Sequence, residues 1–269
     1  MAEELPGKKT AIFATCIVDL MRPEVGFATA RLLASAGFDV VVPAGQTCCG
    51  QPAFNSGAVD EAAAVARKTI ELLEPFDHIV VPSASCAGMI RNAYPELLEG
   101  EADWSDRAWE LAAKTYELTE FLDSVADWTP PPITAGEERA PKEVFYHDSC
   151  ASLRELDLED APRRLLAKCS GLSLASDTDG ETCCGFGGLF SVKYGELSAH
   201  IGGAKALRIA KSGAGVLAGA DLGCLLHLEG LMLRRGLNMK VEHIAEVLDA
   251  GRVSEATAEK AVDESGKGA

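Results

Sequence analysis

The chain has 269 residues, of which 47% are hydrophobic and 25% are charged, so it can form one large or two medium globular domains. A net charge of −16 argues against a nucleic-acid partner and against binding to an anionic membrane surface. No apolar run approaches the roughly 20 residues that a membrane-spanning helix needs, and the first residues lack the features of a signal peptide. We therefore expect a cytoplasmic protein that is not an integral membrane protein, and whose cysteines stay reduced.

Short apolar, β-branched runs alternate with helical patterns in the first half of the chain. The runs predict strands at residues 10–14, 38–42 and 78–81. The helical patterns lie at residues 23–36, 60–73 and 89–98. This alternation predicts a parallel sheet that is covered by helices on both faces.

The second half repeats this order after a proline-rich segment. Residues 129–142 have no apolar period, which predicts a linker between a first domain at residues 8–128 and a second at 143–250. Strands are predicted at residues 143–146, 172–174 and 215–218, and both halves close on similar phrases that we predict to be helical, at residues 116–122 and 241–248. Residues 251–269 are predicted to form a polar tail. The expected fold is α/β, with two tandem Rossmann-like parallel-sheet domains related by an internal duplication.

One cysteine pattern occurs once in each half. The first thiol set comprises Cys16, Cys48, Cys49 and Cys86, and the second thiol set comprises Cys150, Cys183, Cys184 and Cys224. Eight of the nine cysteines belong to these sets, and the ninth, Cys169, is expected to be a buried helix thiol. Two sets of four thiols at matched spacing predict two metal or cluster sites.

The positions of the cysteines support this prediction. They follow predicted strands, and the carboxyl ends of parallel strands are where α/β sheets place their ligands. Cys86 and Cys224 come just before predicted helices, whose N-termini lower the pKa of a thiol and favour an anionic cluster. Gly50 and Gly185 follow the two adjacent pairs, where they permit the positive φ that such a turn requires.

Spacing alone leaves the kind of metal open. Structural zinc usually uses knuckles with two to four residues between ligands, and neither half has a Cys-x-x-Cys. Sites with four thiolates hold iron–sulfur clusters as well as zinc. Adjacent cysteines in a reducing compartment disfavour a disulfide framework. The pattern therefore favours iron–sulfur clusters and keeps zinc as the alternative.

The repeated pattern resembles the cysteine-rich CCG domain, which occurs in tandem in iron–sulfur oxidoreductase subunits. Longer phrases are similar to the lactate utilisation protein A branch of this family, namely residues 46–57, 82–86, 146–150, 183–188 and 221–227. The resemblance spans about residues 9–250. It implies two iron–sulfur clusters, expected to be [4Fe-4S], one on each thiol set. It also implies other iron–sulfur or redox subunits as partners, in a complex that oxidises L-lactate to pyruvate.

The chain departs from the wider family at the end of each domain, and from the lactate utilisation protein A branch at Ala151. That family ends each domain in Cys-x-x-Cys, whereas here Met89 follows Cys86 and His227 follows Cys224 by three residues. His227 is therefore a candidate iron ligand, with a packing role as the alternative, and Met89 is expected in the core. Ala151 stands where this branch commonly carries His.

Several neighbouring residues have an open role. His147 can donate a hydrogen bond to a cluster sulfur or simply close a strand, and Gln51 and Asn55 can line the same crevice. Residues 213–218 match a dinucleotide glycine pattern, but they lead from a predicted helix into a strand, the reverse of the required order.

Two other functions remain as alternatives. One is a disulfide or thiol reductase similar to heterodisulfide reductase B, and the other is a zinc-stabilised scaffold.

Overall fold

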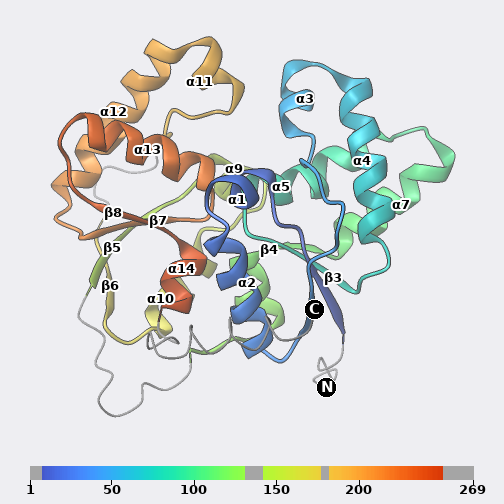
Figure 1. Cartoon of the computed structure of the whole chain (residues 1–269), viewed down its shortest axis with the longest axis horizontal. Helices are drawn as coiled ribbons and strands as arrows, with labels where there is room; N and C mark the ends of the chain where they lie inside the picture. The colour runs from blue at the N-terminus through green and yellow to red at the C-terminus, as the bar shows by residue number, and fades with distance from the viewer. Residues whose placement is uncertain (1–7, 131–141, 177–181, 251–269) are drawn as a thin grey trace, which may run out of the picture.

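The computed structural model describes residues 8–130, 142–176 and 182–250. It contains two α/β halves, each built on a four-stranded parallel sheet (Figure 1). The strand orders are β2-β1-β3-β4 in the first half and β6-β5-β7-β8 in the second. Because the order and the directions match, the prediction of two duplicated Rossmann-like domains is confirmed.

The elements of the first half follow the chain in this order: β1 (Lys9–Ile12), α1 (Cys16–Met21), α2 (Glu24–Ser35), β2 (Asp39–Val41), α3 (Gln51–Ser56), α4 (Val59–Leu73), β3 (His78–Val81), α5 (Ala84–Gly88), the π-helical turn η1 (Met89–Ala93), α6 (Tyr94–Leu97), α7 (Ala102–Ala113), β4 (Thr115–Glu117), α8 (Leu118–Glu120) and the π-helical turn η2 (Phe121–Val125).

The second half contains β5 (Lys142–His147), α9 (Cys150–Arg154), α10 (Asp160–Lys168), β6 (Leu172–Leu174), α11 (Leu189–Lys193), α12 (Gly195–Lys211), β7 (Val216–Gly219), α13 (Leu222–Arg234), β8 (Lys240–His243) and α14 (Ile244–Asp249). The glycine pattern at residues 213–218 leads from α12 into β7, so the expected reversal of the dinucleotide motif is confirmed.

The central strands form where the sequence is apolar on both faces. Ile79, Val80 and Val81 of β3 are all fully buried, as expected for a parallel strand that is covered by helices on both sides. In α4, Ala62, Ala66 and the following apolar residues recur every three or four positions and form the buried face of the helix. The β-branched runs therefore specify the strands of the sheet, and the helical periods specify the helices that cover it.

The closing phrase of each half differs from its prediction. Residues 116–122 and 241–248 were expected to be helical throughout, but each begins as the fourth strand of its sheet. Tyr116 pairs with Val80, and Val241 pairs with Leu217. Because both phrases start with a residue that favours strands, pairing with the neighbouring strand prevails over the helical period there. The predicted helices begin only at Leu118 and Ile244.

The predicted boundaries fall partly on residues without a description. Residues 131–141 of the linker and all of the polar tail at residues 251–269 lie outside the described residues. The domain limits at residues 8–128 and 143–250 therefore stay a prediction. Within the described ranges, no helix combines the length and the apolar character needed to cross a membrane.

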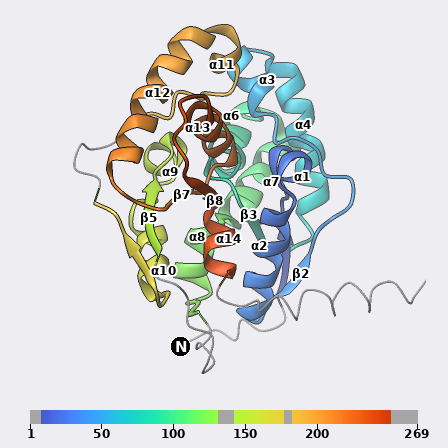
Figure 2. The same ribbon diagram turned by 60° about the vertical axis from the view of Figure 1, so that its left-hand side comes forward.

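The two halves pack against each other through equivalent helices. The last helix of the second half, α14, packs on α2 of the first, and α8 with η2 packs on α10 of the second (Figure 2). Matched ion pairs flank these contacts, with Arg31 bound to Asp249 at 2.6 Å and Arg164 bound to Asp123 at 2.7 Å. One hydrophobic cluster runs through both contacts. The halves thus form a pseudo-symmetric pair with a shared core.

Candidate metal centre

Each cysteine of one thiol set has a partner at the same structural position in the other set. Cys16 and Cys150 are the first residues of α1 and α9, and Cys86 and Cys224 are the third residues of α5 and α13. The adjacent pairs lie in the turns that precede α3 and α11. All of these elements follow the carboxyl ends of parallel strands, so the chain brings its cysteines to one edge of each sheet in three separate passes.

The sulfurs of the first thiol set contact one another. Cys49 Sγ lies 3.3 Å from Cys86 Sγ. Hydrogen bonds from the thiols of Cys16 and Cys49 hold the pKa of Cys48 well below its ordinary value. The same contacts with Cys48 raise the pKa of Cys16 and of Cys49, and burial adds to this rise. Thiols this close oppose one another's ionisation, so a metal cation is what would let all of them bind as thiolates.

The second thiol set is gathered in the same way. Cys184 Sγ lies 2.9 Å from Cys224 Sγ. The backbone N–H groups of Gly185 and Phe186 donate to the sulfurs of Cys183 and Cys184, at 3.3 and 3.4 Å. Such N–H···S bonds favour the thiolate form that metals bind. The contact with Cys184 raises the pKa of Cys183. Partial desolvation and the neighbouring Cys183 raise the pKa of Cys150, although its side chain is exposed on one side.

A glycine in the left-handed region shapes each Cys-Cys turn. Gly50 has φ +87° and Gly185 has φ +84°, which confirms the predicted positive φ. A Cβ on Gly185 would lie 2.5 Å from the carbonyl oxygen of Ser198 and 2.8 Å from the nitrogen of Gly202. The corresponding Cβ on Gly50 would come no closer than 3.3 Å, to the side chain of Val65. The second turn is therefore packed more tightly against its own domain.

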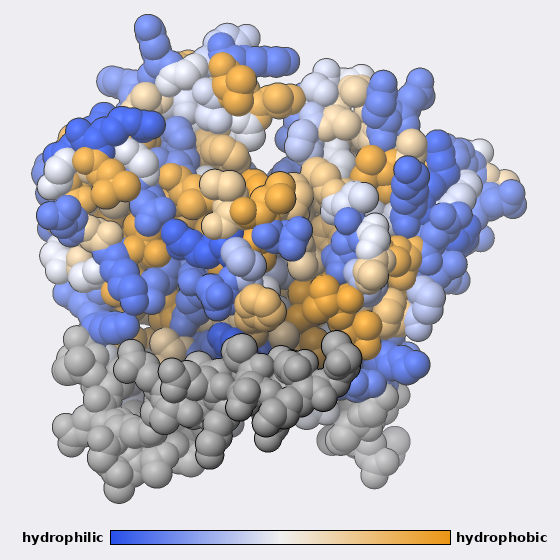
Figure 3. All heavy atoms as spheres, in the orientation of Figure 1, coloured by the Kyte–Doolittle hydropathy of each residue, from blue (hydrophilic) through white to orange (hydrophobic). Residues whose placement is uncertain are grey.

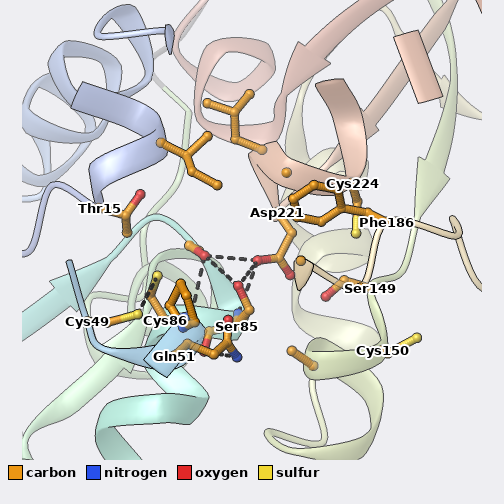
Figure 4. A pocket seen from close by; sticks show the side chains of 18 of the residues that line it. Thr15, Cys49, Gln51, Ser85, Cys86, Ser149, Cys150, Phe186, Asp221 and Cys224 are labelled. Carbon is orange, nitrogen blue, oxygen red and sulfur yellow. Dashed lines mark hydrogen bonds between the residues drawn. The ribbon is translucent and has the colours of Figure 1, made fainter. Parts of the chain in front are cut away.

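Both thiol sets line a single cavity of about 290 Å³ between the halves. Gln51 and Asn55 also line it, as expected, together with Asp221 and Ser85 (Figure 4). In Figure 3 the surface is notched between the α11 and α12 lobe and the α3 and α4 lobe. The sequence predicted one site in each half, but it did not predict that the two sites would share a cavity.

The donors around this cavity fit a soft metal centre. Each half presents four thiols within contact distance, and such sets hold either zinc or iron–sulfur clusters. Cys49 and Cys184, at the inner side of each set, are 2% and 3% exposed, so part of any bound centre would be shielded from water. The site is therefore suited to metal or iron–sulfur binding.

His227 lies behind the second Cys-Cys turn. Its Nε2 atom is 3.3 Å from the hydroxyl of Ser198, and that hydroxyl donates to the carbonyl oxygen of Gly185 at 2.7 Å. Its ring lies 6.0 Å from that of Phe186. These contacts support the turn, whereas iron ligation by His227 stays a prediction. Met89, its counterpart, is buried in the apolar core of the first half, as expected.

His147 lies close to two cysteines of the second thiol set. Its ring nitrogen and the sulfurs of Cys184 and Cys224 all lie within 4.8 Å of one another, and the residue is 2% exposed. The sequence indicated His147 because it lies near Cys150 in the chain, but the structure places its side chain beside Cys184 and Cys224. Phe13 holds the equivalent position at the end of β1 in the first half.

Asp221 and Ser85 line the cavity, but the sequence contains no specific signal for a role of either residue. Asp221 immediately precedes α13, and Ser85 lies in the first turn of α5. An acidic residue before a helical pattern is an available signal, but it predicts only a helix cap.

Cys169 does not line the cavity. It lies buried at the end of α10 and contacts the carbonyl oxygen of Leu165, in agreement with a helix thiol.

Comparisons with known proteins place this site in a family. The cysteine-rich domain model named CCG matches residues 10–91 and 144–229. Lactate utilization protein A of Geobacillus kaustophilus is 43% identical over 242 residues, which cover 90% of this chain and 99% of that protein. Lactate utilization protein A 2 of Bacillus cereus is 37% identical over 246 residues, which cover 90% of this chain and 98% of that protein.

One solved structure shares the fold. A hypothetical protein from Helicobacter pylori matches 96% of this chain with a TM-score of 0.57 and 11% identity. The match spans 51% of that chain, and at 11% identity it supports only a similar fold. The family itself rests on the two cysteine-rich domains and on the relatives that align over nearly their whole length. The chain therefore belongs to the CCG cysteine-rich domain family, as a member of its lactate utilization protein A group.

Proposed function

We propose that this protein is the iron–sulfur electron-transfer subunit of a cytoplasmic complex that oxidises L-lactate to pyruvate. The observation that carries the proposal is the gathering of two equivalent sets of four thiols around one cavity. The names of the relatives support lactate as the substrate of the whole system. The electron acceptors or donors would be other iron–sulfur or redox subunits of that complex.

Each thiol set would hold one [4Fe-4S] cluster, with its four cysteines as ligands. A bound cluster supplies one-electron transfer. The chain itself would orient the thiolates, exclude water at Cys49 and Cys184, and donate backbone N–H bonds to the sulfurs of the second set. These groups tune a reduction potential without taking part in bond making.

Anaerobic reduction tests the electron-transfer role. Protein purified without oxygen should show broad visible absorption that bleaches when a one-electron reductant is added, and an EPR signal should appear. L-lactate alone should produce no bleaching until the partner subunits are added. A colourless preparation that contains zinc and shows no EPR signal after reduction would instead favour the zinc-stabilised scaffold.

The shared cavity favours one second candidate. Because one cavity reaches both thiol sets, a small thiol or disulfide could approach a centre bound there, as a reductase similar to heterodisulfide reductase B would require. An EPR signal that changes when a disulfide is added would favour this enzyme. A signal that is indifferent to thiols and disulfides would leave electron transfer as the function.

A further inference from the structure

Asp221 reaches from the second half of the molecule into the first. Its Oδ1 atom accepts hydrogen bonds from the hydroxyl of Ser83 at 2.9 Å, from the hydroxyl of Ser85 at 2.7 Å and from the backbone N–H of Ser85 at 3.1 Å (Figure 4). The residue is 6% exposed. A single carboxylate oxygen thus gathers three donors from the other half, at the edge of the shared cavity.

These bonds connect the two helix starts that carry the thiols. Ser83 precedes α5, and its hydroxyl also accepts from the N–H of Cys86 at 3.4 Å. Asp221 precedes α13, whose third residue is Cys224. The contact therefore joins the loop of Cys86 to the loop of Cys224. Elsewhere the halves are held by helix packing and by ion pairs such as that of Arg31 with Asp249.

The second oxygen of Asp221 is arranged differently. Oδ2 is buried and has no hydrogen-bond partner among the described residues, and the side chain lines the cavity. A buried acceptor without a partner costs about 1–3 kcal/mol. Since an amide could supply an equivalent Oδ1, the three bonds alone do not account for a carboxylate at this position.

We infer that Asp221 is a positioning residue that fixes the two thiol sets relative to each other and places a negative charge between them. Oδ1 provides the mechanical link through Ser83 and Ser85, whereas Oδ2 has no hydrogen-bond partner among the described residues. The mechanical role stands by itself, whereas the effect of the charge on bound clusters rests on the proposed function. A fixed negative charge close to a cluster stabilises its oxidised state and so lowers its reduction potential.

Three variants separate the link from the charge. Asp221→Asn retains an oxygen acceptor but removes the charge, and Asp221→Leu removes both. Asp249→Ala serves as the control, because it breaks a different contact between the halves, the ion pair with Arg31, and neither residue lines the cavity. The first readout is the alkylation rate of Cys86 and Cys224 in reduced, metal-free full-length protein, measured by mass spectrometry.

In this assay Asp221→Leu should raise the alkylation rate of Cys86 about tenfold, which corresponds to the loss of one or two hydrogen bonds. Asp221→Asn should stay within about twofold of the wild type, and so should Asp249→Ala. Equal rates for Cys86 in the wild type and in Asp221→Leu would overturn the link. If Asp221→Leu does not fold, Ser85→Ala removes one donor and should raise the rate several-fold, and an unchanged rate would again overturn it.

The second readout uses protein loaded with clusters. Asp221→Asn should keep the magnetic interaction between the two reduced centres, seen by EPR, and shift at least one midpoint potential to a more positive value. Asp221→Leu should change both the interaction and the potential. Potentials that are unchanged in both variants would refute the charge role. If the protein binds no clusters, the proposed function fails, and the alkylation rates still decide the link.

Discussion

The two thiol sets occupy equivalent places in the duplicated fold, yet their surroundings differ. In the first set only Cys49 is fully buried, and its three other members are half-buried. In the second set Cys150 and Cys183 are exposed. Phe13 closes the strand behind the first set, and His147 closes the strand behind the second. The halves thus share the ligand geometry but differ in solvent access and polarity, the two properties that tune a metal centre.

The largest expected effect is the loss of one centre at a time. Cys49→Ser and Cys184→Ser each remove the innermost thiol of one set, so each variant should keep about half of the wild-type metal. Metal analysis with EPR of the remaining centre measures this. Cys169→Ser is the matched control and should retain all of the metal. Full metal content in Cys49→Ser would refute the ligand assignment for the first set.

The glycines of the two Cys-Cys turns should respond unequally to substitution. Gly50→Ala places a side chain in the left-handed region, which costs about 1–2 kcal/mol. Gly185→Ala adds a backbone clash with Ser198 and Gly202, so the total should reach about 2–5 kcal/mol. Denaturant unfolding of both variants checks the difference. Equal losses of stability would show that the two turns are equivalent after all.

Glu117 and His243 are buried caps of the equivalent helices α8 and α14, and they should make the stability of the fold depend on pH in opposite directions. Burial lowers the pKa of His243 from 6.5 to about 4 and raises that of Glu117 from 4.5 to about 7. Below pH 6.5 the unfolded chain gains a proton that folded His243 does not, so this residue reduces stability as the pH falls toward 4. Folded Glu117 keeps its proton longer than the unfolded chain, so it reduces stability as the pH rises from 4.5 to 7. Each effect amounts to about 3 kcal/mol.

Substitution of each cap isolates its contribution. His243→Asn retains an acceptor for the N–H of Ala245, and it should remove the loss of stability on the acid side. Glu117→Gln should remove the loss between pH 4.5 and 7. Unfolding free energies across this pH range, at equal metal content, measure both variants. A slope that is identical to the wild type in either variant would mean that the substituted residue does not titrate as described.

Exposure should make Cys150 more reactive than Cys16, its counterpart in the first thiol set. In reduced, metal-free protein, Cys150 should be alkylated several-fold faster than Cys16, because the pKa of both thiols is raised and an attacking reagent reaches the exposed sulfur of Cys150 more easily. Cys49 should be among the slowest. Peptide mass spectrometry over a time course gives these rates. Faster modification of Cys16 than of Cys150 would reverse the comparison.

The smallest expected effect concerns His147. His147→Phe gives the second set the residue that the first has at Phe13, so it should shift the potential of the second centre and leave the first unchanged. Phe13→His should shift only the first centre. Potentiometric titrations followed by EPR separate the two signals. A variant that shifts both centres equally would show that the residue acts on the fold instead of on one site.

The sequence predicted the parts of the molecule that depend on local pattern. The central strands and the grouping of thiols follow from β-branched runs and from cysteines placed after them. The fourth strands were missed because Thr115–Glu117 and Lys240–His243 are too short to outweigh the helical pattern that follows. Pairing with a neighbouring strand decides their structure, and that neighbour is remote in the chain.

The shared cavity and the role of Asp221 depend on how the halves pack. That packing is set by apolar positions on α2 and α14, and on α8 and α10, which lie far apart in the sequence. An apolar position on any of these helices indicates only that it is buried, so nothing local in the sequence identifies the helix that covers it. Asp221 likewise gives only the signal of a helix cap until Ser83 and Ser85 of the other half are placed beside it.

The central claim is that each thiol set holds an iron–sulfur cluster, and metal analysis tests it most directly. Iron, acid-labile sulfide and zinc should be measured together on protein purified without oxygen. Two [4Fe-4S] clusters predict about eight irons and about eight sulfides per chain, with little zinc. Zinc with little iron or sulfide in the same preparation would contradict the account and leave a zinc-stabilised scaffold in its place.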